Sequence, residues 1–402
     1  MERGWLTGEQ FQQLLVVQKR YQEQMAAKRA SEESSEPARA GARTLAGWLA
    51  AAAERGASDL HVHAGQPIRW RIHGELTAAS EDPLDAAAAE ALAIELLSPE
   101  ERRELADSGQ VEVATDVEGV GRVRGGAYRH QQGVDAVFRL VPPRPPLLAD
   151  LSLPLDLARL ANHHQGLVLV TGPAGCGKSS TLAALVHLVN QERRDHVITI
   201  EDPIEYVHRS ERSIVNQRQV GRHTGSFSRA LRAALREDPD VIVVGELRDL
   251  ETISLALTAA ETGHLVLGTL HTSSALATIN RLIGAFPPGQ QPQIRVMVSE
   301  SLRAIVCQRL VRRADGSGRV PALEILLANR AVSNLIRDNK VFQIHSVLQT
   351  GGSRGMKTMA AALDELVERG VVTREEADRH ADPHERAGKP GDHRRPETGA
   401  GR

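Results

Sequence analysis

The stretch GLVLVTGPAGCGKSS, from Gly166 to Ser180, decides the fold. An apolar run leads into a glycine-rich turn that closes on Lys178 and Ser179, and a helical pattern follows. Glycines let backbone N–H groups curl around phosphate oxygens, and the helix that follows adds the positive end of its dipole. The pattern G-x-x-x-x-G-K-[ST], placed between a strand and a helix, therefore predicts a phosphate-binding loop.

The chemistry expected of this loop is nucleotide binding. Lys178 is expected to contact the β- and γ-phosphates and Ser179 to bind Mg²⁺. A glycine turn without a ligand is the alternative, but strand, turn and helix all fit the motif. Cys176 is interpreted as a small residue tolerated in the turn rather than as a redox switch. The expected nucleotide-binding residues of the loop are Gly172, Pro173, Ala174, Gly175, Cys176, Gly177, Lys178, Ser179 and Ser180.

The pattern around the loop, from Asp150 to about Ala377, alternates short apolar runs with helical segments. The runs read LVLVTG, VITIED, VIVVGE and LVLGTLHT. Continuous apolar runs indicate strands that are covered on both faces, as in a parallel α/β sheet. We therefore expect an α/β fold in which the phosphate loop follows one of several parallel strands.

Acidic residues stand at the ends of two of these runs. Glu246 follows VIVV, and Glu201, Asp202 and Glu205 follow VITI. Each acid alone would be interpreted as a solvated loop charge. The carboxyl ends of parallel strands meet at one edge of a sheet, so these acids become candidates for holding a metal and orienting water beside the phosphate loop.

Two histidines flank the run LVLGTL. A lone histidine is more often structural than functional, but His271 lies at the end of a predicted strand, where it is expected to sense the γ-phosphate. His264, at the other end of the run, is included among the nucleotide-binding candidates.

A first mixed unit is expected over residues 44–141. TLAGWLAAAAERG predicts a helix ended by Gly56, and alternating stretches such as GVDAVFRLV predict strands. Ser98, Pro99 and Glu101 predict a further helix that begins with a capping box.

Three segments are expected to lie outside the two folded units. The run PPRPP begins a connector over residues 142–149, because proline lacks a backbone donor and stays extended. Residues 1–43 predict a leader helix followed by a polar linker, and residues 378–402 a disordered tail.

Composition excludes several classes of function. The formal net charge of −2 gives no general attraction to nucleic acid or anionic lipid. The two cysteines, Cys176 and Cys307, support neither a disulfide framework nor a cysteine-based zinc site. No apolar run approaches the roughly 20 residues that span a bilayer, so we expect a cytoplasmic protein.

With these motifs in place, the chain resembles the secretion-superfamily hexameric ATPases, and within them the type IV pilus retraction (twitching-motility, PilT-type) ATPases. The likeness runs from about Gly56 to Ala377. ASDLHVHAGQP resembles the opening of the family's N-terminal PAS-like domain, and GPAGCGKSS its Walker A element. ITIEDPIEYVH resembles the Asp box, VIVVGELRD the atypical Walker B and GTLHTSSA the His box.

The resemblance implies a homo-hexamer of two-domain chains, each a PAS-like domain joined to a RecA-like ATPase domain that binds ATP and Mg²⁺. It implies that Glu205 is the general base for the attacking water and that Glu246 supports Mg²⁺ or that water. Arg122 and Arg124, in GRVRGGAYR, correspond to arginines that reach a neighbouring subunit's nucleotide. The implied output is pilus retraction at the cytoplasmic face of the inner membrane, through the pilus platform protein and without nucleic acid.

Departures from the family pattern leave alternatives open. Ser333 in AVSNLI stands where the family usually has arginine, and Ala360 in GMKTMA stands where it usually has an acid. A regulatory paralogue that binds ATP but retracts little is one alternative. A pilus-extension or type II secretion ATPase is another, although two cysteines cannot build the four-cysteine zinc module usual in those relatives. A nucleic-acid translocase is disfavoured by the charge.

Overall fold

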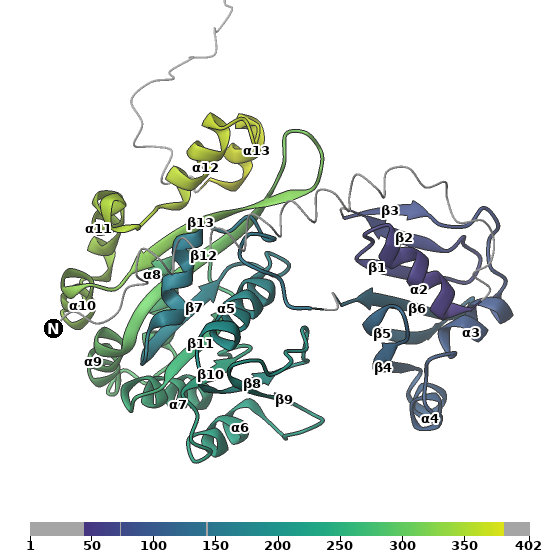
Figure 1. Cartoon of the computed structure of the whole chain (residues 1–402), viewed down its shortest axis with the longest axis horizontal. Coiled ribbons are helices and arrows are strands. Elements are labelled where there is room, and N and C mark those ends of the chain that lie inside the picture. The colour runs from purple at the N-terminus through teal and green to yellow at the C-terminus, as the bar shows by residue number, and fades with distance from the viewer. Residues whose placement is uncertain (1–43, 73, 142–143, 382–402) are drawn as a thin grey trace, which may run out of the picture.

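The computed structural model describes residues 44–72, 74–141 and 144–381, which form two sheets with their helices (Figure 1). The expected leader, the first two residues of the connector and all but the first four residues of the expected tail lie outside these ranges. Both sheets combine with helices, so the α/β fold class is confirmed. Among the described residues, no helix is both long enough and apolar enough to cross a membrane.

The first sheet has six strands in the order β3-β2-β1-β6-β5-β4, and all neighbouring pairs are antiparallel. Its strands are β1 Asp59–Val62, β2 Arg69–Ile72, β3 Glu75–Ala78, β4 Gln110–Val117, β5 Gly121–His130 and β6 Gly133–Leu140. Its helices are α2 Leu45–Glu54, α3 Ala86–Ala93 and α4 Pro99–Ser108. The expected capping box is present, since Ser98 accepts from the Glu101 N–H and the Glu101 side chain accepts from the Ser98 N–H.

The core of this unit forms between the sheet and α2 and α3. Leu45 and Leu49 of α2 are fully buried with Leu60 of β1 and Phe138 of β6. The spacing of the two leucines by four residues places them on one helical face, which explains why this sequence forms a helix against a sheet.

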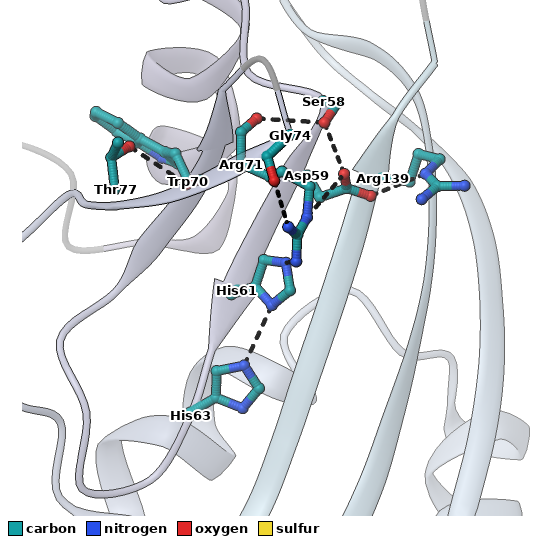
Figure 2. Close-up of polar contacts among 9 residues, drawn as sticks. All are labelled: Ser58, Asp59, His61, His63, Trp70, Arg71, Gly74, Thr77 and Arg139. Carbon is teal, nitrogen blue, oxygen red and sulfur yellow. Dashed lines mark hydrogen bonds and ion pairs between the residues drawn. The ribbon is translucent and has the colours of Figure 1, made fainter. Parts of the chain in front are cut away.

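A polar network ties β1 to both of its neighbouring strands (Figure 2). The Asp59 carboxylate, only 4% exposed, accepts from Arg139 of β6 at 2.8 Å and lies 3.8 Å from Arg71 of β2. Burying a carboxylate costs free energy unless it is paired and hydrogen-bonded, so these arginines stabilise the buried carboxylate at the start of β1.

The second sheet has seven strands in the order β13-β12-β7-β11-β10-β8-β9. Its strands are β7 Gly166–Thr171, β8 His196–Glu201, β9 Ile214–Gln219, β10 Val241–Val244, β11 Leu265–Leu270, β12 Leu302–Arg312 and β13 Arg319–Leu327. The four strands predicted from sequence are parallel neighbours, as expected. The strands β9 and β12 extend the parallel sheet, and β13 closes it as an antiparallel edge.

Helices cover both faces of the second sheet (Figure 1). Leu167 and Leu169 of β7 pack in one apolar cluster with α7 and α9, while Val168 and Val170 pack in a second cluster with α5. The elements are η1 Leu155–Asn162, α5 Lys178–Glu192, α6 Phe227–Ala234, α7 Leu250–Glu261, α8 Ala275–Gly284 and α9 Gln291–Ser301. Because both faces are covered, β7 is buried along its whole length.

The C-terminal helices follow β13. They are α10 Arg330–Arg337, η2 Val341–Gln343, α11 Ile344–Thr350, η3 Gly352–Arg354, α12 Met359–Glu368 and α13 Arg374–His380. The expected boundary at Ala377 falls inside α13, where Ala377 itself is buried against α12 and β12, so the helix continues past that boundary to His380.

Candidate active site

The phosphate loop lies between β7 and α5, as the motif predicts. Gly177 is the N-cap of α5 with φ +87°, and Gly172 opens the turn with φ +143°. A Cβ at Gly172 would lie 2.3 Å from the carbonyl oxygen of Gln308 and 2.7 Å from Sγ of Cys176. Only glycine therefore fits at the start of the turn.

Lys178 is the charged group of the loop. Its side chain is buried, and Nζ donates to the carbonyl oxygens of Gly172 and Pro173, both at 2.9 Å. Nζ also lies 3.3 Å from Nδ1 of His271. The two carbonyl partners bear no net charge that would offset the ammonium, so Lys178 favours an anion at the loop.

A chain of polar contacts links Lys178 to an acid. Lysine only donates, so Nδ1 of His271 accepts from it, and the Nε2–H of His271 then faces Oε1 of Glu246 at 3.3 Å. The second oxygen of Glu246 lies 2.8 Å from Nε of Arg248. Both oxygens of Glu246 are thus engaged, and the tautomer of His271 is fixed by its two neighbours.

The order of the sheet explains why these side chains meet. The strands β7, β11, β10 and β8 are consecutive parallel neighbours. Lys178 follows β7, His271 follows β11 and Glu246 follows β10, so all three stand beyond the same edge. The sequence-based expectation that carboxyl ends of strands gather the site agrees with this arrangement.

The segment after β8 brings a second pair of acids. Oε1 of Glu201 accepts from Oγ1 of Thr199 at 2.6 Å and from Nε2 of Gln217 at 3.0 Å. Burial raises the pKa of the Glu201 carboxyl despite these bonds. Glu205 is different, since its side chain is 41% exposed and its contact is Nη1 of Arg124 at 3.4 Å. Glu201 therefore orders the segment, whereas Glu205 is accessible to a reactant.

The next residue anchors this segment to the loop helix. The hydroxyl of Tyr206 lies 2.8 Å from Oγ of Ser180, in the first turn of α5. The sequence placed Ser180 among the nucleotide-binding residues, but the structure shows it bonded to the segment that carries Glu205. Ser179 is exposed beside it, and Asp202 is also exposed.

The two arginines of β5 occupy different surroundings. Arg124 was expected to reach the nucleotide of a neighbouring subunit, but in this chain it contacts Glu205. Arg122, two residues earlier on the same face of the strand, lies 3.6 Å from Asp116 of β4 and is mostly buried. Only Arg124 is therefore brought to the site within one chain.

One expected site residue lies elsewhere. His264 precedes β11, and the pairing of Leu265 with Gly166 places it at the amino edge of the sheet. At about 3.3 Å per residue, that edge is roughly 20 Å from the phosphate loop. His264 instead contacts the carbonyl oxygen of Ala259, so its expected nucleotide contact is not supported within this chain.

Sequence reasoning missed Gln308 and Tyr206. Gln308 of β12 is 3% exposed and bonds to the phosphate loop. An amide inside the apolar strand LRAIVCQRLVR is a signal that could have identified it, because buried polar groups need partners. Tyr206 offered no such signal, since tyrosine is common at half-buried positions.

A cleft of about 920 Å³ lies between the first unit and the segments around β9. Its lining combines acidic side chains with basic ones, namely Glu100, Glu101, Glu104 and Glu112 with Arg124, Arg139 and Arg222, and no residue of the phosphate loop contributes. Because the phosphate loop does not line this cleft, we do not assign the nucleotide to it.

The oxygen donors beside the phosphate loop determine whether a metal ion fits the site. Among the residues that the structure describes, no group of three or more His, Cys, Asp or Glu side chains could hold a metal by itself. Mg²⁺ in nucleotide sites needs only one or two protein oxygens, because phosphates and waters supply the remainder. The hydroxyl of Ser179 and the carboxylate of Glu246 are oxygen donors of this type, so the residues fit such an ion.

Comparisons with known proteins show the family of this chain. The family model described as "Type II/IV secretion system protein" matches residues 36–360. The type IV pilus retraction ATPase PilT of Pseudomonas aeruginosa is 46% identical over 329 residues, which cover 82% of this chain and 95% of that protein. A twitching motility protein of Neisseria gonorrhoeae is 46% identical over 311 residues, covering 77% of this chain and 83% of that protein.

A solved structure extends the similarity to three dimensions. The crystal structure of the pilus retraction motor PilT with bound ADP matches with a TM-score of 0.78 and 45% identity. The match covers 85% of this chain and 98% of that one. The match therefore spans both units of the fold.

Proposed function

The chain belongs to the type II/IV secretion system protein family and is of the PilT type, and from this premise we propose that it hydrolyses ATP to power type IV pilus retraction. The observation that carries the proposal is the contact chain Lys178–His271–Glu246 across the ends of three neighbouring strands. This contact chain supports the proposal because it joins a cation, an imidazole and a carboxylate beside the phosphate loop of a chain that is 46% identical to a retraction ATPase.

Nucleotide binding is assigned to the loop from Gly172 to Ser180. Backbone N–H groups of the loop and the start of α5 suit the phosphates, and Lys178 supplies charge. For phosphates to be bound, Nζ of Lys178 has to exchange its two carbonyl partners for phosphate oxygens. His271 contacts both Lys178 and Glu246, so a change in the partners of Lys178 also changes the contacts of His271.

Mg²⁺ is proposed to be held by Ser179 and Glu246 together with the phosphates. A bound Mg²⁺ supplies charge neutralisation at the phosphate oxygens. The Glu246 carboxylate is 20% exposed, so Mg²⁺ can reach it. The contact of Glu246 with Arg248 shows that this carboxylate already pairs with one cation.

The attacking water is assigned to Glu205. Its carboxylate is more exposed than that of Glu246 and has one contact, with Arg124, whereas both oxygens of Glu246 are engaged. A general base needs a free lone pair within hydrogen-bond reach of the water, which favours Glu205. Glu201 and Asp202 are proposed to position this segment rather than to transfer protons.

Assembly is proposed to be a homo-hexamer in which Arg122 and Arg124 complete a neighbour's site. The 3.4 Å contact of Arg124 with Glu205 is long for a charged pair, so Arg124 can exchange it for a contact with a neighbouring subunit's nucleotide. The partner is proposed to be the platform protein of the pilus machine, at the cytoplasmic face of the inner membrane. No role with nucleic acid is proposed.

The alternatives are not favoured, because two relatives that match along most of the chain are a pilus retraction ATPase and a twitching motility protein. The unusual Ser333 lies on α10, half-buried, between buried Val332 and exposed Asn334. Ala360 is half-buried on α12. Both helices lie outside the phosphate loop, so we propose that the two substitutions affect output rather than hydrolysis.

The experiment is deletion of the gene in its host, followed by imaging of surface pili. Retraction predicts cells with persistent pili that do not shorten, and restored shortening when the wild-type gene is returned. A gene that encodes Lys178→Ala is the matched control and should not restore shortening. Bald cells would instead indicate an extension ATPase and would contradict the proposal.

A further inference from the structure

Gln308 lies beside the phosphate loop without belonging to any motif of the sequence. It is on β12, which runs parallel to β7 with Cys307 paired to Thr171. Gln308 is therefore level with Gly172, where the loop leaves the sheet. Its side chain is 3% exposed, so both ends of the amide need partners within the protein.

Both ends of that amide are bonded to the loop and its helix. Nε2 donates to the carbonyl oxygen of Cys176 at 2.6 Å, and Oε1 accepts from Oγ1 of Thr181 at 2.7 Å. Hydrogen bonds are stronger in the protein interior than in water, so these two bonds restrict the motion of the Cys176 carbonyl and the Thr181 side chain.

The loop also packs on Gln308 at its first and last glycines. A Cβ at Gly172 would lie 2.3 Å from the carbonyl oxygen of Gln308, and a Cβ at Gly177 would lie 2.9 Å from its Nε2. The start and the end of the loop thus pack directly on one residue of the neighbouring strand.

The bond to Cys176 has a consequence for phosphate binding. In a planar trans peptide the C=O and the following N–H point in opposite directions. A Cys176 carbonyl held against Gln308 therefore turns the N–H of Gly177 away from β12. We propose that Gln308 is a positioning residue for ATP hydrolysis, which aims the Gly177 N–H at the phosphates through its bond to Cys176.

This inference rests on the proposed nucleotide site, and it demands a particular side chain. The position needs one donor, for Cys176, and one acceptor, for Thr181. An ionised glutamate can still accept from Thr181 but cannot donate to the carbonyl, and methionine fills the volume with neither capacity.

The test is the steady-state kinetics of ATP hydrolysis by the full chain carrying Gln308→Met or Gln308→Glu. Leaving a buried carbonyl unpaired predicts an increase of about tenfold or more in KM for ATP. The kcat should change much less, because the Gly177 N–H binds ground state and transition state alike. Gln308→Glu is the second variant should Gln308→Met fail to fold.

Cys307→Ala is the matched control. Cys307 precedes Gln308 on β12 and is equally buried, and its sulfur accepts from Thr171 without touching a loop carbonyl. A merely structural role of β12 predicts the same rise in KM for Cys307→Ala, and that outcome overturns the inference. A wild-type KM in either folded Gln308 variant also overturns it. A wild-type chain without turnover contradicts the proposed function instead, so the two failures are distinguishable.

Discussion

Substitution of Gly172 by alanine tests whether the phosphate loop is packed as the structure shows. The new Cβ would meet the backbone oxygen of Gln308 at 2.3 Å and Sγ of Cys176 at 2.7 Å. A backbone oxygen in a central strand cannot rotate away, so the loop has to move. Gly175→Ala is the matched control, because Gly175 has φ +74° but a Cβ there would meet nothing within 4 Å.

The two variants share one cost and differ in another. An alanine in a sparsely populated backbone region at positive φ costs about 1–3 kcal/mol, and both positions bear a cost of this kind. The steric overlap adds about 1–3 kcal/mol at Gly172 alone. In a domain of this size each kcal/mol lowers the melting temperature by about 2–4 °C, so Gly172→Ala should melt about 2–12 °C below Gly175→Ala.

The assay is thermal unfolding of the purified chains without nucleotide, followed by the same measurement with saturating ADP. ADP should raise the melting temperature of the wild type by mass action and should do so much less for Gly172→Ala, whose loop is displaced. Equal melting temperatures for the two alanine variants would refute the close packing of the loop on Gln308.

Three further predictions concern catalysis, assembly and pH. Glu205→Gln and Glu246→Gln should keep ADP binding, measured by calorimetry, while phosphate release slows by about 10²-fold or more, since general bases contribute at least that much; unchanged turnover in both would contradict their roles. A chain with Arg124→Ala mixed with a chain carrying Lys178→Ala should regain turnover if arginines act between subunits, and no recovery in mixed assemblies would contradict this. Burial lowers the pKa of His208 to about 4, so the unfolded state takes up the proton first as the pH falls below about 6.5. Between pH 7 and pH 5 this should cost about 2 kcal/mol of stability, and chemical denaturation of His208→Gln should show a smaller loss over the same interval.

The sequence predicted the core of the site because its signals are local. The loop from Gly172 to Ser179 is one contiguous motif, and Glu246 and His271 each follow an apolar run that could only be a buried strand. Because parallel strands end at one edge of a sheet, Glu246 and His271 were expected to lie close together. In the structure their side chains are 3.3 Å apart.

The features that the sequence could not predict depend on the direction in which a strand runs and on the pairing of strands that are far apart in the chain. His264 and His271 flank the same run, but only the residue after a strand reaches the site edge, and His264 precedes it. Gln308 reaches the loop because β12 pairs with β7 across more than a hundred residues, and no local pattern specifies that pairing. The contact of Arg124 with Glu205 likewise joins two units that the sequence treats separately.

The central claim is that the phosphate loop with its Lys178–His271–Glu246 chain hydrolyses ATP. The most direct measurement is steady-state phosphate release from ATP by the purified full chain, beside Lys178→Ala prepared in the same way. Removing one preorganised charge of this kind typically lowers the rate by about 10²–10³-fold, so the variant should lose turnover to that extent while its melting temperature without nucleotide stays near that of the wild type. Equal turnover by a folded Lys178→Ala chain would contradict the account.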